Sequence, residues 1–194
     1  MKTLASVELS ITICGWVLFL LVFIARPRGA RRPWVASDRR SVAGIVLQVA
    51  AVSIMRGGLR PAGAGLLPGG FDVELAVCAL AVGLIVASLV LAASAVAALG
   101  TQWSLTARLV EGHELITSGP YALVRHPIYT ATLGLLVGSA LCVSRWQDLI
   151  AAVVVFLIGT ALRVHSEERL LTTEFGDEYR AYAGAVPALI PLTT

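Results

Sequence analysis

Residues 73–99 read VELAVCALAVGLIVASLVLAASAVAAL, and Glu74 is the only charged side chain in these 27 positions. About 20 apolar residues in helical geometry cross the hydrocarbon core of a bilayer, so this run is more than long enough to span it. Because lipid offers no hydrogen bonds to an exposed backbone, the run is predicted to be a helix. Either one tilted helix or a span with an interfacial extension accounts for its length.

Four further apolar segments lie on either side of this run, and the composition of the chain agrees with them. The 194 residues are 57% hydrophobic and 14% charged, whereas a soluble domain is about a quarter charged. We therefore predict an all-α integral membrane protein with about five transmembrane helices. Segments 42–55 and 149–162 are shorter than a perpendicular span, so Arg163, just after the last of them, is expected near the water boundary. The four segments are Leu9–Ala25, Val42–Met55, Ile128–Ser144 and Leu149–Leu162.

The distribution of arginine predicts how the chain is oriented. Residues 26–41 hold six arginines against the single acidic residue Asp38, which assigns this segment to the cytoplasm and the N-terminus to the outside. Residues 100–127 and the tail after Arg163 then fall on the cytoplasmic side, while 56–72 and 145–148 are external. Membrane topology thus accounts for the net charge of +3, and no nucleic-acid partner is predicted. The six arginines are Arg26, Arg28, Arg31, Arg32, Arg39 and Arg40.

Other short signals are weak. The run 9–25 is longer than the apolar part of a secretory signal, and arginines follow it, so it is interpreted as a retained span. Neither end carries a lipidation motif. The three cysteines lie inside apolar runs and predict no disulfide framework. Gly63-Ala-Gly65 lacks the strand and helix of a nucleotide-binding loop and is interpreted as part of a flexible external loop.

The first of two polar segments, residues 111–129, reads EGHELITSGPYALVRHPIY. Its glycines and prolines break helices, so 118–126 is predicted to be a wrapped loop. Free backbone donors and aromatic tips in such a loop suit a flat heteroaromatic ligand. The alternative is an interfacial connector in which Tyr121 and Tyr129 are membrane-belt aromatics and Arg125 is an anchor.

The second polar segment, residues 163–182, reads RVHSEERLLTTEFGDEYRAY and is predicted to continue the last apolar helix. Its four-residue spacing places Arg163 and Glu167 on one helix face, as a functional pair or as a helix-end salt bridge. The spacing of the three histidines fits no helical metal motif, so no metal site is predicted. No Ser or Cys stands in a nucleophile motif, which argues against covalent hydrolysis. The histidines are His113, His126 and His165.

Three motifs together resemble the isoprenylcysteine carboxyl methyltransferase family: residues 112–129, Arg163-x-x-x-Glu167-Glu168, and Phe175-Gly-Asp-Glu-Tyr-Arg-Ala-Tyr182. The resemblance extends over about residues 100–187. It implies a division into residues 1–99, with the first three transmembrane helices, and residues 100–194, a methyltransferase core. That core would comprise transmembrane helices four and five and a cytoplasmic C-terminal helix. Loops and this last helix would form a cytoplasmic pocket for S-adenosyl-L-methionine, which leaves as S-adenosyl-L-homocysteine.

The resemblance also assigns roles to individual side chains. Arg163 would orient the methyl acceptor, and Glu167 would contact the cofactor, which makes these two the predicted catalytic residues. Glu168 would share in cofactor binding, and Thr106 falls where the family begins its cofactor pocket. The cofactor-binding set is His113, Glu114, Leu115, Ile116, Tyr121, His126, Pro127, Ile128, Tyr129, Glu167, Glu168 and Thr106.

The chemistry of the acceptor agrees with these roles. A carboxylate has a pKa near 4, so it is ionised at neutral pH and needs alignment and desolvation rather than a general base. The resemblance favours the carboxylate of a C-terminal S-prenylcysteine on a lipophilic acceptor that enters from the bilayer lipid. Three alternatives stay open: a phospholipid or other lipid amine methyltransferase, an NADPH-dependent sterol-type membrane reductase, and a non-catalytic membrane scaffold. The helices of residues 1–99, which the resemblance does not cover, would select the lipid part of the acceptor.

Overall fold

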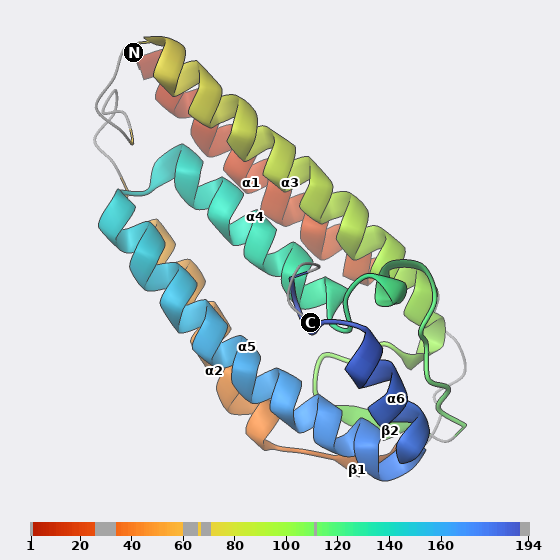
Figure 1. Cartoon of the computed structure of the whole chain (residues 1–194). Helices are drawn as coiled ribbons and strands as arrows, with labels where there is room; N and C mark the ends of the chain where they lie inside the picture. The colour runs from red at the N-terminus through yellow and green to blue at the C-terminus, as the bar shows by residue number, and fades with distance from the viewer. Residues whose placement is uncertain (1, 26–33, 60–65, 67–70, 111, 191–194) are drawn as a thin grey trace.

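The computed structural model describes residues 2–25, 34–59, 66, 71–110 and 112–190. Long helices run back and forth along one axis, and a short helix, α6, lies near the end of the described chain (Figure 1). The five long helices are α1 (Lys2–Ile24), α2 (Arg40–Gly57), α3 (Phe71–Leu99), α4 (Pro127–Val143) and α5 (Trp146–Phe175), and α6 covers Asp177–Ala185.

These helices identify a multi-pass membrane protein. Among the described residues, four are long and apolar enough to cross a bilayer: Ser6–Ile24, Arg40–Gly57, Asp72–Gln102 and Trp146–Phe175. Helix α4 is apolar but has only 17 residues, because Pro127 starts it directly after the wrapped loop. The predicted five spans thus correspond to four full-length helices and one shorter helix. The segment expected to end near residue 162 belongs to α5, a helix of 30 residues that carries the second polar segment as far as Phe175. The prediction that this helix continues to residue 182 is corrected, because Gly176, with a φ of +55°, ends α5 and the residues after it belong to α6.

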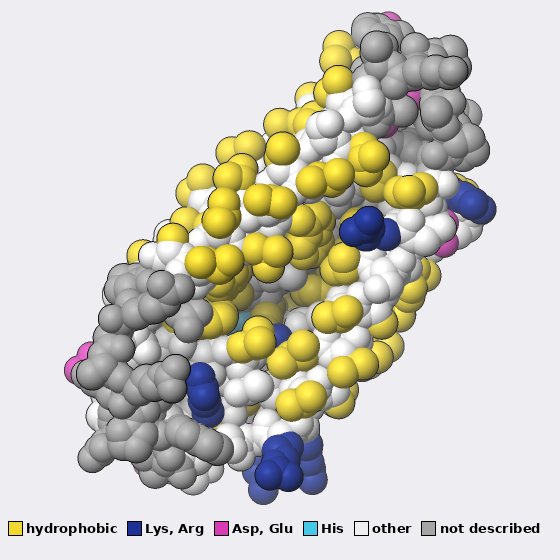
Figure 2. All heavy atoms as spheres, turned by 180° about the vertical axis from the view of Figure 1, so that it is seen from behind, with side chains coloured by type: hydrophobic (Ala, Val, Ile, Leu, Met, Phe, Trp, Pro, Cys, Tyr) yellow, Lys and Arg dark blue, Asp and Glu magenta, His cyan; other side chains and the backbone are white. Residues whose placement is uncertain are grey.

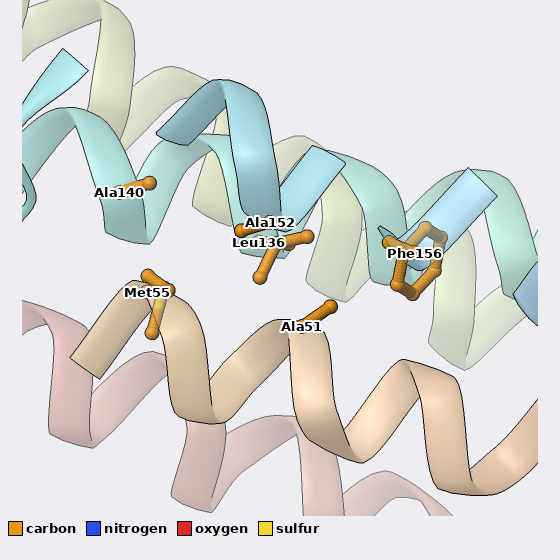
Figure 3. Close-up of a cluster of buried hydrophobic side chains, with 6 residues drawn as sticks. All are labelled: Ala51, Met55, Leu136, Ala140, Ala152 and Phe156. Atoms are coloured by element: carbon orange, nitrogen blue, oxygen red, sulfur yellow. The ribbon is translucent and has the colours of Figure 1, made fainter. Parts of the chain in front are cut away.

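The helices form two groups that meet at α4. Helices α1, α3 and α4 pack on one another, α2 packs along α5, and α4 contacts both members of this pair. Figure 3 shows where α2, α4 and α5 meet around buried apolar side chains. Gly44 on α2 and Gly159 on α5 allow a close approach, since a Cβ on Gly159 would lie 2.8 Å from the Gly44 carbonyl oxygen. The buried side chains in Figure 3 are Ala51, Met55, Leu136, Ala140, Ala152 and Phe156.

A short antiparallel strand pair corrects the all-α prediction. Strand β1 (Trp34–Ser37) pairs with β2 (Arg108–Val110). Both stretches contain the β-branched residues that favour strands, and pairing satisfies backbone groups that no helix uses. The two predicted cytoplasmic loops therefore lie at one end of the bundle, the end that carries β1, β2 and α6 and is called the site end below (Figure 1). Arg26, Arg28, Arg31 and Arg32, on which the predicted orientation depends, lie outside the described residues.

The predicted loop at 118–126 is confirmed as a non-α-helical segment at the site end. It contains a 3₁₀ turn at Gly119–Ala122, and Gly119 has a φ of +61°, a conformation that favours glycine. The chain after α6 docks on this loop, since the Arg125 amide donates to the Pro187 carbonyl at 2.9 Å. The His126 amide likewise donates to the Ala188 carbonyl at 3.0 Å. The loop is thus held between the start of α4 and the end of the described chain.

Candidate functional site

A cavity of about 820 Å³ lies between the two helix groups and is called the central cavity below. Its apolar part is lined by α1, α2 and α5, and its polar part lies at the site end, where the loop before α4 and the last two helices contribute. Figure 2 shows a hollow on one face of the molecule with mostly hydrophobic side chains around it. The cavity therefore offers a ligand an apolar section and a polar section in one continuous space.

Most residues named from the sequence line this cavity. They come from three separate stretches, namely the loop after α3, the loop before α4 together with the first turn of α4, and the second half of α5, and packing brings them together. Glu168 is the exception, because it is not among the lining residues. The named residues on the wall are Thr106, His113, Glu114, Leu115, Ile116, Tyr121, His126, Pro127, Ile128, Tyr129, Arg163 and Glu167.

Arg163 is buried at the junction of the polar and apolar sections, with 6% of its surface exposed. Its Nη1 donates to Gln48 Oε1 at 3.0 Å, and its Nη2 donates to the Leu105 carbonyl. The Tyr129 ring covers one face of the guanidinium, 4.8 Å from the Arg163 Cζ to the ring centroid. The Nε atom is buried and has no hydrogen-bond partner among the described residues. The guanidinium of this cavity-wall residue thus retains an unsatisfied donor.

Glu167 follows Arg163 by one helical turn. The Tyr129 hydroxyl donates to Glu167 Oε1, and His126 Nδ1 lies 3.5 Å from Glu167 Oε2. Arg163 Nη2 lies 4.0 Å from Glu167 Oε1, which is the limit of an ion pair. The carboxylate is therefore fixed in direction but not neutralised by a close contact with Arg163.

Glu168 contacts a different set of residues from Glu167. Arg125 Nη2 lies 2.8 Å and His126 Nε2 3.2 Å from Glu168 Oε1. Arg125 Nη1 also donates to the Ala183 carbonyl at 2.7 Å and to the Val186 carbonyl. This cluster ties α5, the loop before α4 and the end of α6 together, and its Arg125 and His126 also line the cavity.

Both ring nitrogens of His126 face carboxylates, which can only accept hydrogen bonds when ionised. Burial lowers the pKa of His126, but hydrogen bonds and charge attraction from Glu167 and Glu168 outweigh it, and the net pKa is raised. Burial instead lowers the pKa of His113, with Glu174 partly opposing it. The site end thus holds one histidine that favours the charged form and one that favours the neutral form.

The tyrosines at the site end stay protonated. Burial is the largest cause of the raised pKa of Tyr121, and Glu167 adds to it. Burial also raises the pKa of Tyr182 to about 12, with Arg125 opposing. The Tyr182 hydroxyl donates to the Tyr121 carbonyl at 2.6 Å, which fixes α6 against the wrapped loop. These hydroxyls serve as hydrogen-bond donors rather than as bases.

Several wall residues are not among the site residues predicted from the sequence. Gln48 on α2 contacts Arg163, the Leu105 carbonyl accepts from it, and Trp103 and Tyr182 complete the polar section. Gln48 carried a signal, since it is the only side-chain amide within the apolar segment 42–55 and a polar side chain in a span calls for a partner. The Leu105 contact uses a backbone oxygen, which every residue type has, so the sequence could not predict it.

Comparison with known proteins agrees with the resemblance. The profile of the phospholipid methyltransferase family matches residues 76–178. Protein-S-isoprenylcysteine O-methyltransferase B of Arabidopsis thaliana is 37% identical over 84 residues, 43% of each chain. Protein-S-isoprenylcysteine O-methyltransferase of Schizosaccharomyces pombe is 34% identical over 80 residues, 41% of this chain and 34% of that one. Cobalt-zinc-cadmium resistance protein CzcN of Cupriavidus metallidurans is 35% identical over 82 residues, 42% of this chain and 37% of that one.

The matches share one part of the molecule. Each aligned segment spans less than half of this chain and less than half of the relative. The family match begins within α3, includes the first polar segment and the second as far as residue 178, and ends in α6, so α1 and α2 lie outside it. The match covers more than half of the 194 residues, and the chain therefore belongs to the phospholipid methyltransferase family, as its likeness to the isoprenylcysteine carboxyl methyltransferases predicts.

Proposed function

We propose that the protein transfers a methyl group from S-adenosyl-L-methionine to the carboxylate of a lipophilic acceptor at the cytoplasmic face of a membrane. The favoured acceptor is a C-terminal S-prenylcysteine. Family membership supports methyl transfer, and the names of two similar relatives support a prenylcysteine acceptor. Because the matches cover less than half of those relatives, the activity and the acceptor are proposals for this chain.

The polar section of the central cavity fits the cofactor. Its wall contains buried polar atoms without partners among the described residues, His113 Nδ1 and Ser104 Oγ, which a polar ligand would satisfy. Glu167 supplies a negative charge for a cationic sulfonium, and Tyr121 and Trp103 supply aromatic faces. When bound, S-adenosyl-L-methionine supplies an electrophilic methyl group. The residues of the section would bind it by charge, by stacking and by hydrogen bonds.

The unsatisfied Nε donor of Arg163, in the wall of the central cavity, is the observation that carries the carboxylate acceptor. Arginine binds a carboxylate through two parallel hydrogen bonds, and here Nε has no other partner among the described residues. An amine acceptor would be repelled by the same charge. Arg163 would therefore hold the acceptor carboxylate beside Glu167, at the boundary between the polar and apolar sections.

The apolar section would hold the lipid part of the acceptor. Large apolar side chains from three helices line it, among them Trp16, Phe19, Val52 and Phe156. Burying such a chain is favourable at about 0.8 kcal/mol per CH₂ group removed from water. A headgroup at Arg163 and a chain among these residues would satisfy both sections with one amphipathic molecule.

Catalysis would then depend on placement. The acceptor carboxylate is already ionised at neutral pH, so no residue need remove a proton. Arg163 would align one carboxylate oxygen with the methyl group, and the surrounding aromatic side chains would exclude water. The contacts from Tyr129 and His126 to Glu167 would keep that charge in place during transfer.

The test uses the full chain purified in detergent. Titration with S-adenosyl-L-homocysteine should show saturable binding, and titration with NADPH should show none. With labelled S-adenosyl-L-methionine, N-acetyl-S-farnesylcysteine should give a base-labile methyl ester. Phosphatidylethanolamine, the amine acceptor, should give no N-methylated product. Absence of S-adenosyl-L-homocysteine binding at millimolar concentration would contradict methyl transfer, and N-methylation alone would contradict the carboxylate acceptor.

A further inference from the structure

Helix α2 lies outside the segment matched by the family profile, yet it forms one wall of the central cavity. Gln48 stands near its middle, in the membrane-spanning segment Arg40–Gly57. A side-chain amide in such a segment is costly unless its donors and acceptors are satisfied. The contacts of Gln48 therefore indicate why an amide stands at this position.

Gln48 has partners on α5 for both ends of its amide. Its Oε1 accepts from Arg163 Nη1 at 3.0 Å, and its Nε2 donates to Thr160 Oγ1 at 2.9 Å. A guanidinium can only donate, so the amide oxygen must face Arg163 and the amide nitrogen must face Thr160. Thr160 is fully buried and precedes Arg163 by nearly one helical turn. The guanidinium thus fixes the direction of the amide, and the Thr160 hydroxyl accepts from the amide nitrogen.

Gly44, one turn before Gln48 on α2, leaves room for the aliphatic part of the Arg163 side chain. A Cβ at position 44 would lie 2.4 Å from Arg163 Cγ and 2.5 Å from the Gly159 carbonyl oxygen. The aliphatic stem of Arg163 therefore passes directly over Gly44, and its head reaches Gln48. Helix α2 contacts this side chain along its length and limits the directions that the guanidinium can take.

We propose that Gln48 is a positioning residue that holds the guanidinium of Arg163 in place for the acceptor carboxylate without adding a negative charge beside it. This inference rests on the proposed carboxylate acceptor. A carboxylate at position 48 would hold the guanidinium equally well but would compete with the acceptor for its charge. A neutral amide holds the guanidinium and leaves that charge available, so α2 belongs to the acceptor site and sets its preference for an anion.

The experiment measures binding of two probes to the purified full chain, N-acetyl-S-farnesylcysteine and its carboxamide. Trp16 and Trp103 line the cavity, so tryptophan fluorescence reports both. The variants are Gln48→Leu, which loses the hydrogen bond, and Gln48→Glu, which keeps a hydrogen bond but adds a competing charge. Val46→Leu is the control, because Val46 is on α2, is 61% exposed and is not a wall residue. Melting temperature and S-adenosyl-L-homocysteine affinity are measured for each variant.

In the wild type and in Val46→Leu, the carboxylate probe should bind more tightly than the carboxamide. Both Gln48 variants should weaken the carboxylate probe by about tenfold, the equivalent of one charge-assisted hydrogen bond, and raise its KM in the methyl-transfer assay. Affinities for the carboxamide and for S-adenosyl-L-homocysteine should stay within about twofold of the wild type. The Gln48→Glu variant distinguishes a positioning role from a role in stability. It should melt no lower than the wild type and still lose the preference for the carboxylate probe over the carboxamide.

A Gln48→Glu variant that keeps the wild-type ratio of probe affinities would overturn the inference, as would a wild type that binds the two probes equally. Failure of the proposed function gives a different result, in which the wild type prefers the carboxylate probe but forms no methyl ester. In that case the probe ratios of the Gln48 variants still decide whether α2 positions Arg163.

Discussion

Two arginine–glutamate pairs lie side by side at the site end, and their contacts differ. Arg125 donates from Nε to Glu168 at 2.9 Å, approaches the same oxygen with Nη2, and donates from Nη1 to two carbonyls of the chain after α5. Arg163 donates only to neutral acceptors, lies 4.0 Å from Glu167, and has a buried Nε without a partner among the described residues. Every nitrogen of the Arg125 guanidinium therefore has an acceptor, whereas Nε of Arg163 has none among the described residues.

The difference predicts that the Arg125–Glu168 pair stabilises the fold and that the Arg163–Glu167 pair binds a ligand. A buried charge is tolerated when its hydrogen bonds are satisfied, as they are for Arg125. An arginine that remains partly unsatisfied in a cavity has a cost that a bound anion would offset. The Arg125–Glu168 pair is therefore expected to govern stability, and the Arg163–Glu167 pair to govern binding and turnover.

The largest expected effect is on turnover in Arg163→Ala. Loss of the group that aligns the acceptor should lower kcat/KM by about 100- to 1000-fold, as removal of a single transition-state contact does in other enzymes. S-adenosyl-L-homocysteine binding should persist, which shows that the fold is intact. Arg169→Ala is the control, because Arg169 is exposed on the same helix and is not a wall residue. Wild-type turnover in Arg163→Ala would remove Arg163 from the site.

The next effect is on stability in Arg125→Ala. This change leaves Glu168 with His126 as its remaining ion-pair partner among the described residues and two carbonyls without their Arg125 donor, so the free energy of unfolding should fall by about 2 to 4 kcal/mol. Reversible unfolding in mixed SDS micelles measures it. Arg180→Ala is the matched control, because the ion pair of Arg180 with Asp177 is exposed and should contribute nothing measurable to the free energy of unfolding. A stable but inactive Arg125→Ala would reverse the two roles.

A smaller effect, on the affinity for the positively charged cofactor, is expected in Glu167→Gln. The amide keeps the shape and still accepts from the Tyr129 hydroxyl, but the negative charge is lost. Affinity for the cationic S-adenosyl-L-methionine should fall by about tenfold, and affinity for the uncharged sulfur of S-adenosyl-L-homocysteine should fall much less. Competition binding with the two ligands gives this ratio. An equal loss for both would mean that Glu167 does not interact with the sulfonium.

Apolar patterning predicted the helices well because each span is determined locally. The run 73–99 lies within α3 almost to the residue, and the polar segment after 163 continues α5 as far as Phe175. The turn at Gly176, which separates α5 from α6, was not predicted. The strand pair was not predicted, because it joins segments more than seventy residues apart and only packing of the helices brings them together. The predicted division at residue 99 stays a prediction, and α2–α5 and α3–α4 pack across it.

Motifs named the site residues but did not resolve neighbouring roles. Glu167 and Glu168 are adjacent in sequence and about 100° apart around the helix, so only one can face the cavity. Which one does depends on where Arg125 docks, and that is decided by the end of α6 and the segment after it. Gln48 was not predicted either, because its role depends on a contact with Arg163, which lies 115 positions away in the sequence.

The smallest expected effect concerns pH and His126, which lies between the two pairs with Glu167 on one nitrogen and Glu168 on the other. Its pKa in the folded protein is raised above the usual value near 6.5, since the two carboxylates outweigh burial. The folded state therefore binds this proton more tightly than the unfolded state, so the contribution to stability is complete below pH 6.5 and is lost as the pH rises through the raised pKa. In His126→Asn this dependence should disappear. The melting temperatures of wild type and variant should thus differ most in acid and converge in alkali, with Arg125 paired throughout. A difference that grows with pH would mean that His126 is neutral between the two carboxylates.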